Sequence, residues 1–232
     1  MPTHFAPAGI RFLKQLKTHN ERDWFNERKA TFEKEVQAPW LVFIDEVNEA
    51  FADFAPDYVK PARKAALRIY RDIRFSKNKL PYKTHMAAWW STTTQVRTSG
   101  GGFYVQVSPE EVTVAAGVYQ PEPGQLLAIR RHLQERHAEL RSLLDDRKRR
   151  TLLPDFDGNL LTRMPKGFQP DDPAAELLLC RQWALSARLP GALATTPQML
   201  AEVVKRFAAA APVVALLNEP LLAAVKTRRS LF

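Results

Sequence analysis

The sequence predicts an α+β fold in a single domain, residues 1–232, with a central, mainly antiparallel sheet flanked by N-terminal and C-terminal helices. Three observations support this prediction. Residues 1–55 are helical in pattern, residues 65–120 contain short β-rich runs, and residues 121–232 return to helices and loops. Because the strands do not alternate with helices one for one, a doubly wound parallel sheet is disfavoured.

The N-terminal region is expected to form a helix over residues 7–18, with Pro7 in its first turn. Asn20 is expected to be the N-cap of a second helix, because its side chain can accept from exposed amides. Pro39 lacks an amide donor and should kink or end that helix. The apolar stripe over residues 40–54 then predicts a helix packed in the core.

The β-rich region starts with two short strand-like runs, residues 67–70 and 85–90, the second followed by a candidate strand over 91–94. Gly100 to Gly102 are expected to form a flexible turn. Two β-rich runs around a short polar turn then predict a hairpin, residues 103–108 and 112–118.

Two helices are expected after Pro123, the first carrying Leu126 and the second Leu140. The basic run Arg147–Arg150 should lie at or just past a helix end, where the helix dipole favours cations, or else contact nucleic acid. An irregular segment over 154–170, a short helix from Asp172-Pro173 to Leu179, a strand over 182–188 and a helix opening at Thr196-Pro197 complete the expected chain.

The composition is basic, with 34 Lys and Arg against 25 Asp and Glu, and a formal charge of +9. This excess favours nucleic acid or phosphorylated ligands as partners, although basic composition alone also accounts for it. No apolar run reaches the roughly 18 residues of a membrane span. With the single cysteine Cys180 and no signal-peptide pattern at the N-terminus, we expect a cytoplasmic location.

The usual catalytic signatures are absent from the sequence, namely the phosphate-binding loop, the dinucleotide fingerprint and the nucleophile elbow. His132 and His137 are five residues apart and so would not share a helical face as two metal ligands. Cys180 follows three leucines and is expected to be a buried, inert thiol. The sequence therefore indicates no metal-ligating residues and leaves any cofactor unknown.

The main chemical signal lies in residues 67–85, where basic and aromatic side chains alternate and Asp72 is the single acid. Arginine binds phosphate or carboxylate in a bidentate manner, and lysine adds point charge. We therefore expect a site that binds an anion. The candidate ligand-binding residues in this stretch are Arg68, Tyr70, Arg71, Arg74, Ser76, Lys77, Lys79, Tyr82 and Lys83.

Tyr119 and Glu122 at a strand end, and Lys166 in an irregular loop, are further candidates for the same site. If the protein catalyses a reaction, the candidate acid–base groups are Asp72, His85 and Glu122. Asp72 also has the option of orienting an arginine. The structural alternative is an internal ion network, in which acids such as Asp72, Glu110, Glu111 and Glu122 neutralise the cations.

The central stretch, Arg68-Ile-Tyr-Arg-Asp-Ile-Arg-Phe-Ser-Lys-Asn-Lys-Leu-Pro-Tyr-Lys83, closely resembles the motif of domain-of-unknown-function family 2461, an uncharacterised family of bacteria and fungi. The resemblance extends from about residue 5 to about residue 190 through Phe12–Leu16, Asn20–Phe25, Gly117–Tyr119, Ile129-Arg130 and Pro165–Phe168. Asn78 replaces an expected acid and Asp172 an expected histidine. The resemblance implies a single intracellular domain and supplies no established activity.

Three functions are compatible with the sequence. In the first, a cationic and aromatic pocket accepts a phosphate-bearing small molecule or nucleotide, with or without catalysis. In the second, the same residues, together with Arg147–Arg150 and Lys226–Arg229, bind nucleic acid without sequence preference, because aromatic groups beside cations suit base stacking. In the third, the motif is an internal ion network of a structural or partner-binding protein. A concave pocket favours the first, a broad exposed face the second, and a paired carboxylate for each arginine the third.

Overall fold

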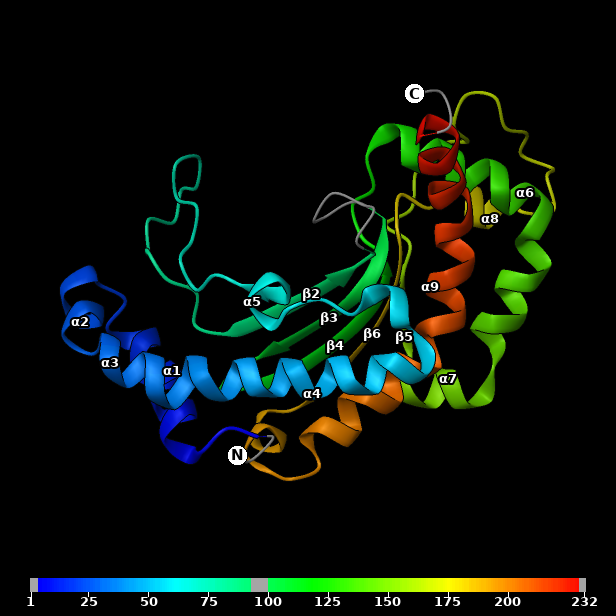
Figure 1. Ribbon diagram of the computed structural model, residues 1–232. Helices are drawn as coiled ribbons and strands as arrows, with labels where there is room; N and C mark the ends of the chain where they lie inside the picture. The colour runs from blue at the N-terminus through cyan, green and yellow to red at the C-terminus, as the bar shows by residue number, and fades with distance from the viewer. Residues whose placement is uncertain (1–3, 93–99, 230–232) are drawn as a thin grey trace. The chain divides into compact units, whose positions relative to one another are not determined.

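The computed structural model describes residues 4–92 and 100–229, with side chains up to residue 222. Within this part of the chain, the strands form one six-stranded antiparallel sheet in the order β1-β2-β3-β4-β6-β5 (Figure 1). The strands are β1 Ala66–Leu67, β2 Met86–Ser91, β3 Gly101–Val107, β4 Glu111–Val118, β5 Asp155–Asp157 and β6 Trp183–Pro190. The sheet together with the helices confirms the predicted α+β class.

The chain divides into two compact units. The first comprises residues 1–90, 104–114 and 188–204, and the second comprises residues 91–103, 115–187 and 205–232. Each unit is described by itself below. That the whole chain forms a single domain stays a prediction.

Two helices that were predicted from the sequence are confirmed in the first unit. The predicted first helix is confirmed as α1 Pro7–Thr18, and the apolar stripe lies in α4 Ala38–Phe54. Pro39 occupies the first turn of α4, directly after a turn of π-helix, so the helix changes at the predicted place. The remaining short helices are α2 Arg22–Glu27, α3 Lys29–Phe32, the π-helix η1 Glu33–Gln37, the 3-10 helices η2 Pro56–Tyr58 and η3 Gly191–Thr195, and α5 Ala62–Ala65.

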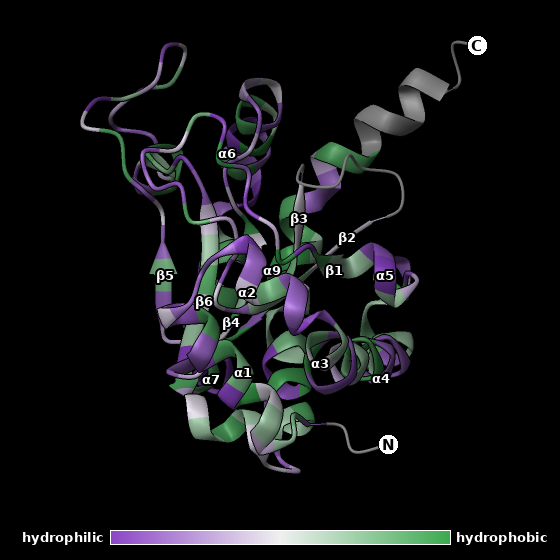
Figure 2. Ribbon diagram, turned by 90° about the vertical axis from the view of Figure 1, so that its left-hand side faces the viewer, coloured by the Kyte–Doolittle hydropathy of each residue, from purple (hydrophilic) through white to green (hydrophobic). Residues whose placement is uncertain are grey.

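The core of the first unit is built on the aromatic side chains of α4. Trp40 is fully buried and stacks on Phe5 and Phe43, with ring centroids 5.9 and 5.3 Å apart. Phe51 meets Trp90 of β2 edge to face at 5.5 Å. In Figure 2, α4 carries both green and purple segments, as expected of a helix with one buried face.

Gly9 allows α1 to lie directly against the π-helix η1. A Cβ atom at this position would lie 2.4 Å from the backbone oxygen of Glu35, well inside van der Waals contact. Because the obstacle is backbone rather than a movable side chain, any larger residue would force the two helices apart.

One strand prediction and one turn prediction in the β-rich region are wrong in part. The predicted strand over residues 67–70 ends at Leu67, because the chain beyond it leaves β2 and pairs with its own returning segment through a bridge between Tyr70 and Tyr82. Gly101 and Gly102 form the start of β3 instead of a flexible turn. The prediction for 85–90 is confirmed by β2, and the hairpin is confirmed as β3 and β4. Of the candidate strand over 91–94, Ser91 ends β2, and residues 93 and 94 lie outside the described residues.

Gly101 belongs to the strand because an asparagine pairs with its backbone. Asn218 Oδ1 accepts from the Gly101 amide at 2.7 Å, and Asn218 Nδ2 donates to the Gly101 carbonyl at 3.0 Å. A Cβ atom at residue 101 would lie 3.1 to 3.3 Å from this amide group. The close approach favours glycine and satisfies a buried peptide group.

The second unit contains α6 Pro123–Asp145, α7 Arg147–Leu152, α8 Ala175–Leu178 and the greater part of α9 Met199–Arg229. The two helices expected after Pro123 are one element, α6, with a kink at Arg136. The basic run Arg147–Arg150 lies just past the end of α6, as predicted, and it also opens α7. The reason is that Asp146 caps α7, its Oδ1 accepting from the Arg149 amide at 2.7 Å. Across the described residues, no helix is long and apolar enough to cross a membrane.

Candidate functional site

The predicted anion site lies on a long excursion between β1 and β2, which we call the cationic loop, residues 68–83. In Figure 1 it is the extended turquoise segment between α5 and β2, without helix or strand at its tip. Its two ends pair with each other through backbone hydrogen bonds. The Lys83 amide donates to the Ile69 carbonyl at 2.8 Å, and the Arg71 amide donates to the Pro81 carbonyl at 2.9 Å. These bonds hold the two arms of the loop together.

Asn20 fixes the base of the loop to the N-terminal helices. Its Oδ1 accepts from the Tyr82 amide at 3.0 Å, and its Nδ2 donates to the Tyr82 carbonyl at 3.1 Å. Asn20 is therefore not the N-cap of α2, and Glu21 occupies that position. The Tyr82 ring stacks on Phe25 with centroids 4.1 Å apart, and both side chains are buried. The base of the loop is thus part of the core.

The tip of the loop carries one ion pair. Asp72 accepts two side-chain hydrogen bonds from Arg74, from Nε at 3.0 Å and from Nη2 at 2.8 Å, and one from the Arg74 amide at 3.2 Å. These bonds from Arg74 lower the pKa of the Asp72 carboxyl to about 2. A carboxylate this acidic is a poor proton acceptor at neutral pH. The geometry matches the orienting role considered for Asp72 more closely than the role of a base.

Most of the other cations of the loop are exposed to solvent. Among the described residues, the side chains of Arg68, Arg71 and Lys77 make no ion pair. Lys79 Nζ donates to the Ile73 carbonyl at 3.0 Å and so braces the tip. Lys83 is half-buried at the base, as is Ser76 within the tip. The loop therefore combines one paired arginine with several cations that face solvent.

Apolar side chains accompany these cations at the surface. Phe75 is 95% exposed, and Tyr70 and Leu80 are each 46% exposed. The Arg74 guanidinium lies 5.8 Å from the centroid of the Phe75 ring, within the range of a cation–π contact. Tyr70 leans against Tyr82, with ring centroids 5.3 Å apart. Arg68 and Tyr70 are exposed, whereas Ile69 between them is buried.

The acids proposed for an internal ion network are engaged elsewhere, apart from Asp72. Glu110 pairs with Lys17 at 2.6 Å, and Glu111 accepts from the Thr113 hydroxyl at 3.0 Å. Glu122 forms a capping box at the start of α6, where its amide donates to Gln125 Oε1 at 3.1 Å. Within the described residues, these contacts leave the loop with a surplus of positive charge.

His85 lies partly buried just past the loop, immediately before β2. Burial, assisted by the nearby charge of Lys83, lowers the pKa of its imidazole to about 4. His85 is therefore neutral at pH 7 and adds nothing to the positive charge of the loop. A neutral imidazole has a free lone pair and can still act as a proton acceptor.

Three predicted site residues belong to the second unit and are described within it. Tyr119 is 54% exposed, and its hydroxyl accepts from Gln120 Nε2 at 3.5 Å. Glu122 is the α6 cap described above. Lys166 is exposed in a turn that ends at the buried Phe168. Their participation in one site with the cationic loop stays a prediction.

The second basic segment, Arg147–Arg150, exposes fewer cations to a ligand than its sequence suggests. Arg149 is only 5% exposed, and its Nη1 donates to the Leu153 carbonyl at 2.9 Å at the end of α7. Arg149 thus stabilises a helix end and does not face an external ligand. The side chains of Lys226–Arg229 lie outside the described residues.

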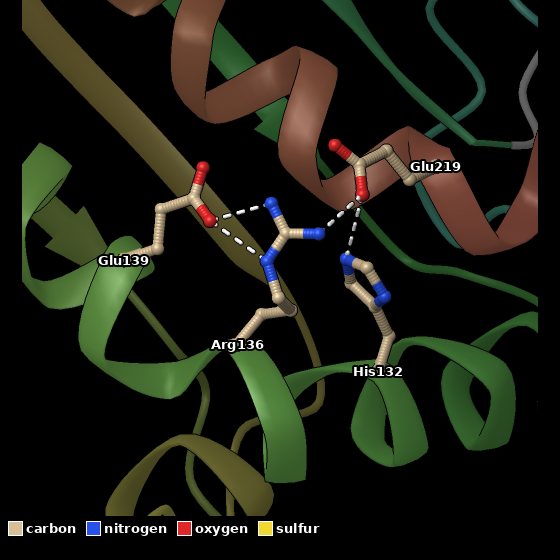
Figure 3. Close-up of polar contacts among 4 residues, drawn as sticks. All are labelled: His132, Arg136, Glu139 and Glu219. Carbon is tan, nitrogen blue, oxygen red and sulfur yellow. Dashed lines mark hydrogen bonds and ion pairs between the residues drawn. The ribbon is translucent and has the colours of Figure 1, made fainter.

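The second unit contains a polar cluster that connects α6 with α9 (Figure 3). Glu219 of α9 accepts from Arg136 Nη1 at 3.0 Å and lies 3.3 Å from His132 Nε2. Arg136 also pairs with Glu139, one turn further along α6. Because Arg136 is the non-helical residue of α6, with φ −113° and ψ 16°, these carboxylates hold its side chain at the kink. We interpret the cluster as a structural contact between α6 and α9.

Comparison with known proteins places the chain in a family. Residues 8–215 match the sequence profile of the family described as conserved hypothetical protein (DUF2461). The chain belongs to this family. The match confirms the family that the resemblance indicated, and it extends into both units of the DUF2461 protein. No curated protein and no solved structure matches the chain.

Sequence reasoning identified the loop but missed the residues that position it. Asn20 and Phe25 hold the base of the loop, although they lie far from it in the sequence. The available signal was the resemblance, which included Asn20–Phe25 together with the central motif. Helix-capping rules interpreted Asn20 locally, and its actual partner is Tyr82, 62 residues away.

Proposed function

We propose that this DUF2461 protein binds nucleic acid without sequence preference, and that the cationic loop supplies the contacts to phosphate. The observation that carries this proposal is the exposure of unpaired cations on an extended loop. Arg68 and Lys77 face solvent and make no ion pair within the described residues. A nucleic acid backbone offers phosphates at regular spacing to such a surface, and binding releases the counterions that surround it.

The internal ion network is disfavoured by the partners of the acids. Asp72 forms its ion pair with Arg74 and feels the charge of Arg68 only at longer range, while Glu110 pairs with Lys17, outside the loop. An internal network would bury its charges and match each with a carboxylate, because an unpaired buried charge is costly. Arg68 and Lys77 meet neither condition within the described residues.

A phosphate-bearing small molecule would use the same chemistry. Small ligands are normally enclosed in concave sites that bury most of their surface. The tip of the loop, from Arg74 to Leu80, is largely exposed and extends into solvent. This geometry suits a polymer that passes along a surface more than a ligand that must be enclosed, so the nucleic acid is preferred. No reaction is part of the proposal.

The test is a fluorescence anisotropy titration of short labelled oligonucleotides, both single-stranded and duplex, over a series of salt concentrations. The test variant is Arg68→Ala/Lys77→Ala. The matched control is Arg11→Ala/Lys14→Ala, which removes the same charge from exposed positions of α1 that make no ion pair within the described residues. Both variants are checked for folding by circular dichroism.

The expected result is binding by the wild-type protein with a steep dependence on salt. For a single strand, the loop variant should lower the slope of log K against log salt by about 1.4, at about 0.7 for each lost phosphate contact. The control should leave the slope close to the wild-type value. Absence of binding at low salt would refute the proposal. Thermal stabilisation by nucleotides or sugar phosphates would then favour the small ligand.

A further inference from the structure

The tip of the cationic loop carries an apolar feature that phosphate binding does not require. The Phe75 ring is almost wholly exposed, although burial of such a ring normally stabilises a fold. Single exposed apolar residues are ordinary on protein surfaces. Phe75 differs because it lies at the end of an extended loop, between Arg74 and Lys77.

The ring is placed by its neighbours. Asp72 holds the Arg74 guanidinium through both carboxylate oxygens, and this guanidinium lies 5.8 Å from the Phe75 ring centroid. Since its Nε and Nη2 donate to Asp72, Arg74 is less available to phosphate than the unpaired cations are. Its geometry is that of a positioning residue, which orients the aromatic ring.

We propose that the cationic loop prefers single-stranded nucleic acid, and that Phe75 is the platform on which a base stacks. This inference rests on the proposed function. In a duplex the faces of the bases are covered by neighbouring base pairs, whereas a single strand leaves them free to stack on an aromatic ring. The cations on either side of Phe75 then contact the backbone on both sides of the stacked nucleotide.

The sequence of the tip disfavours insertion into a membrane as the purpose of the exposed ring. Between Phe75 and Leu80 lie Ser76, Lys77, Asn78 and Lys79, and all but the half-buried Ser76 are exposed. Inserting this tip would carry two lysines toward the hydrocarbon region, which is costly. A nucleic acid accommodates both the ring and the lysines.

The experiment compares Phe75→Ala, Phe75→Trp and the wild-type protein by anisotropy on three probes, namely a single strand, an abasic strand of the same length and a duplex. Phe156→Ala, which removes a partly exposed phenylalanine of β5, is the matched control. Phe75→Ala should weaken binding of the single strand by roughly five- to 150-fold, the range reported for loss of one stacked base. Its affinity for the abasic strand and its salt slope should not change, and Phe75→Trp should bind the single strand at least as well as wild type.

The outcomes separate this inference from the proposed function. Binding that depends on Arg68 and Lys77 but is unaffected by Phe75→Ala refutes the stacking role and leaves the proposed function standing. Equal affinity of the wild-type protein for the single strand and the abasic strand would also refute the stacking role and leave the proposed function standing. Absence of any oligonucleotide binding overturns both. Binding to phosphatidylcholine vesicles containing phosphatidylserine that is lost in Phe75→Ala, with oligonucleotide binding unchanged, assigns the ring to a membrane surface and refutes the inference.

Discussion

Replacing Asn20 by alanine should destabilise the protein by more than most single substitutions. The side chain is 6% exposed, and its two hydrogen bonds satisfy both the amide and the carbonyl of Tyr82, which is 3% exposed. Each buried backbone group that loses its partner costs about 1 to 3 kcal/mol. We therefore expect Asn20→Ala, which leaves two such groups without this partner, to lower the free energy of unfolding by about 2 to 6 kcal/mol.

Asn20→Asp tests the donor and the acceptor separately. An aspartate keeps the acceptor for the Tyr82 amide but places a carboxylate against the Tyr82 carbonyl. Repulsion and burial should raise the pKa of the new carboxyl in the folded state above its unfolded value. The variant should consequently be least stable, relative to wild type, at neutral pH. It should recover stability as the pH falls, because the protonated carboxyl can donate to the carbonyl.

The assay is urea denaturation followed by circular dichroism and tryptophan fluorescence, with wild type and variants at equal protein concentration. Asn78→Ala is the control, because Asn78 is exposed and makes one hydrogen bond, to the Leu80 amide at 2.9 Å. That substitution should cost less than about 1 kcal/mol. An Asn20→Ala variant within about 0.5 kcal/mol of wild type would show that the backbone groups of Tyr82 find other partners, and would refute the reasoning.

Three further predictions concern single charged or titratable groups. Asp72→Asn should release Arg74 and steepen the slope of log K against log salt for single-stranded DNA by about 0.7, as measured by anisotropy. An unchanged slope would mean that Arg74 either contacts phosphate already in the wild-type protein or never does. The depressed pKa of His85, about 4, means that the unfolded state binds a proton before the folded state does. The free energy of unfolding should therefore fall as the pH drops from about 6.5 to about 4. In urea titrations across this pH window, His85→Gln should remove part of that pH dependence. Identical pH profiles of the variant and wild type would exclude His85 as its source. Glu219→Gln should lower the stability by up to about 1 kcal/mol, because its partners are partly exposed, and the melting temperature measures this. A loss of several kcal/mol would contradict it.

The elements of the fold that depend on local patterns could be predicted from the sequence. The apolar spacing of α4 and the β-rich runs of the hairpin each specify their own burial, and both appear as expected. The place of Pro39 follows from its missing amide. In each case the residues that determine the structure lie within about two turns or one hairpin of each other.

What could not be predicted depends on partners far away in the sequence. Asn20 binds Tyr82, and Asn218 binds Gly101, over separations of 62 and 117 residues. Capping and turn rules interpret asparagine and glycine by their neighbours, so they misplaced Asn20 and the glycine segment. The basic run in α7 shows the same limit, because burial of Arg149 cannot be read from its charge. The exposure of Phe75 likewise required the course of the loop.

The way in which Asn20 holds the loop bears on how this protein can diversify. Its amide binds the main chain of Tyr82, and so the attachment does not depend on which side chains follow along the tip, residues 72–80. Lengthening a flexible loop is also cheap, since doubling its length costs only about 0.6 kcal/mol. The attachment of the loop therefore places little constraint on the sequence or the length of the tip. Substitutions or insertions in the tip should leave the contact between Asn20 and Tyr82 intact.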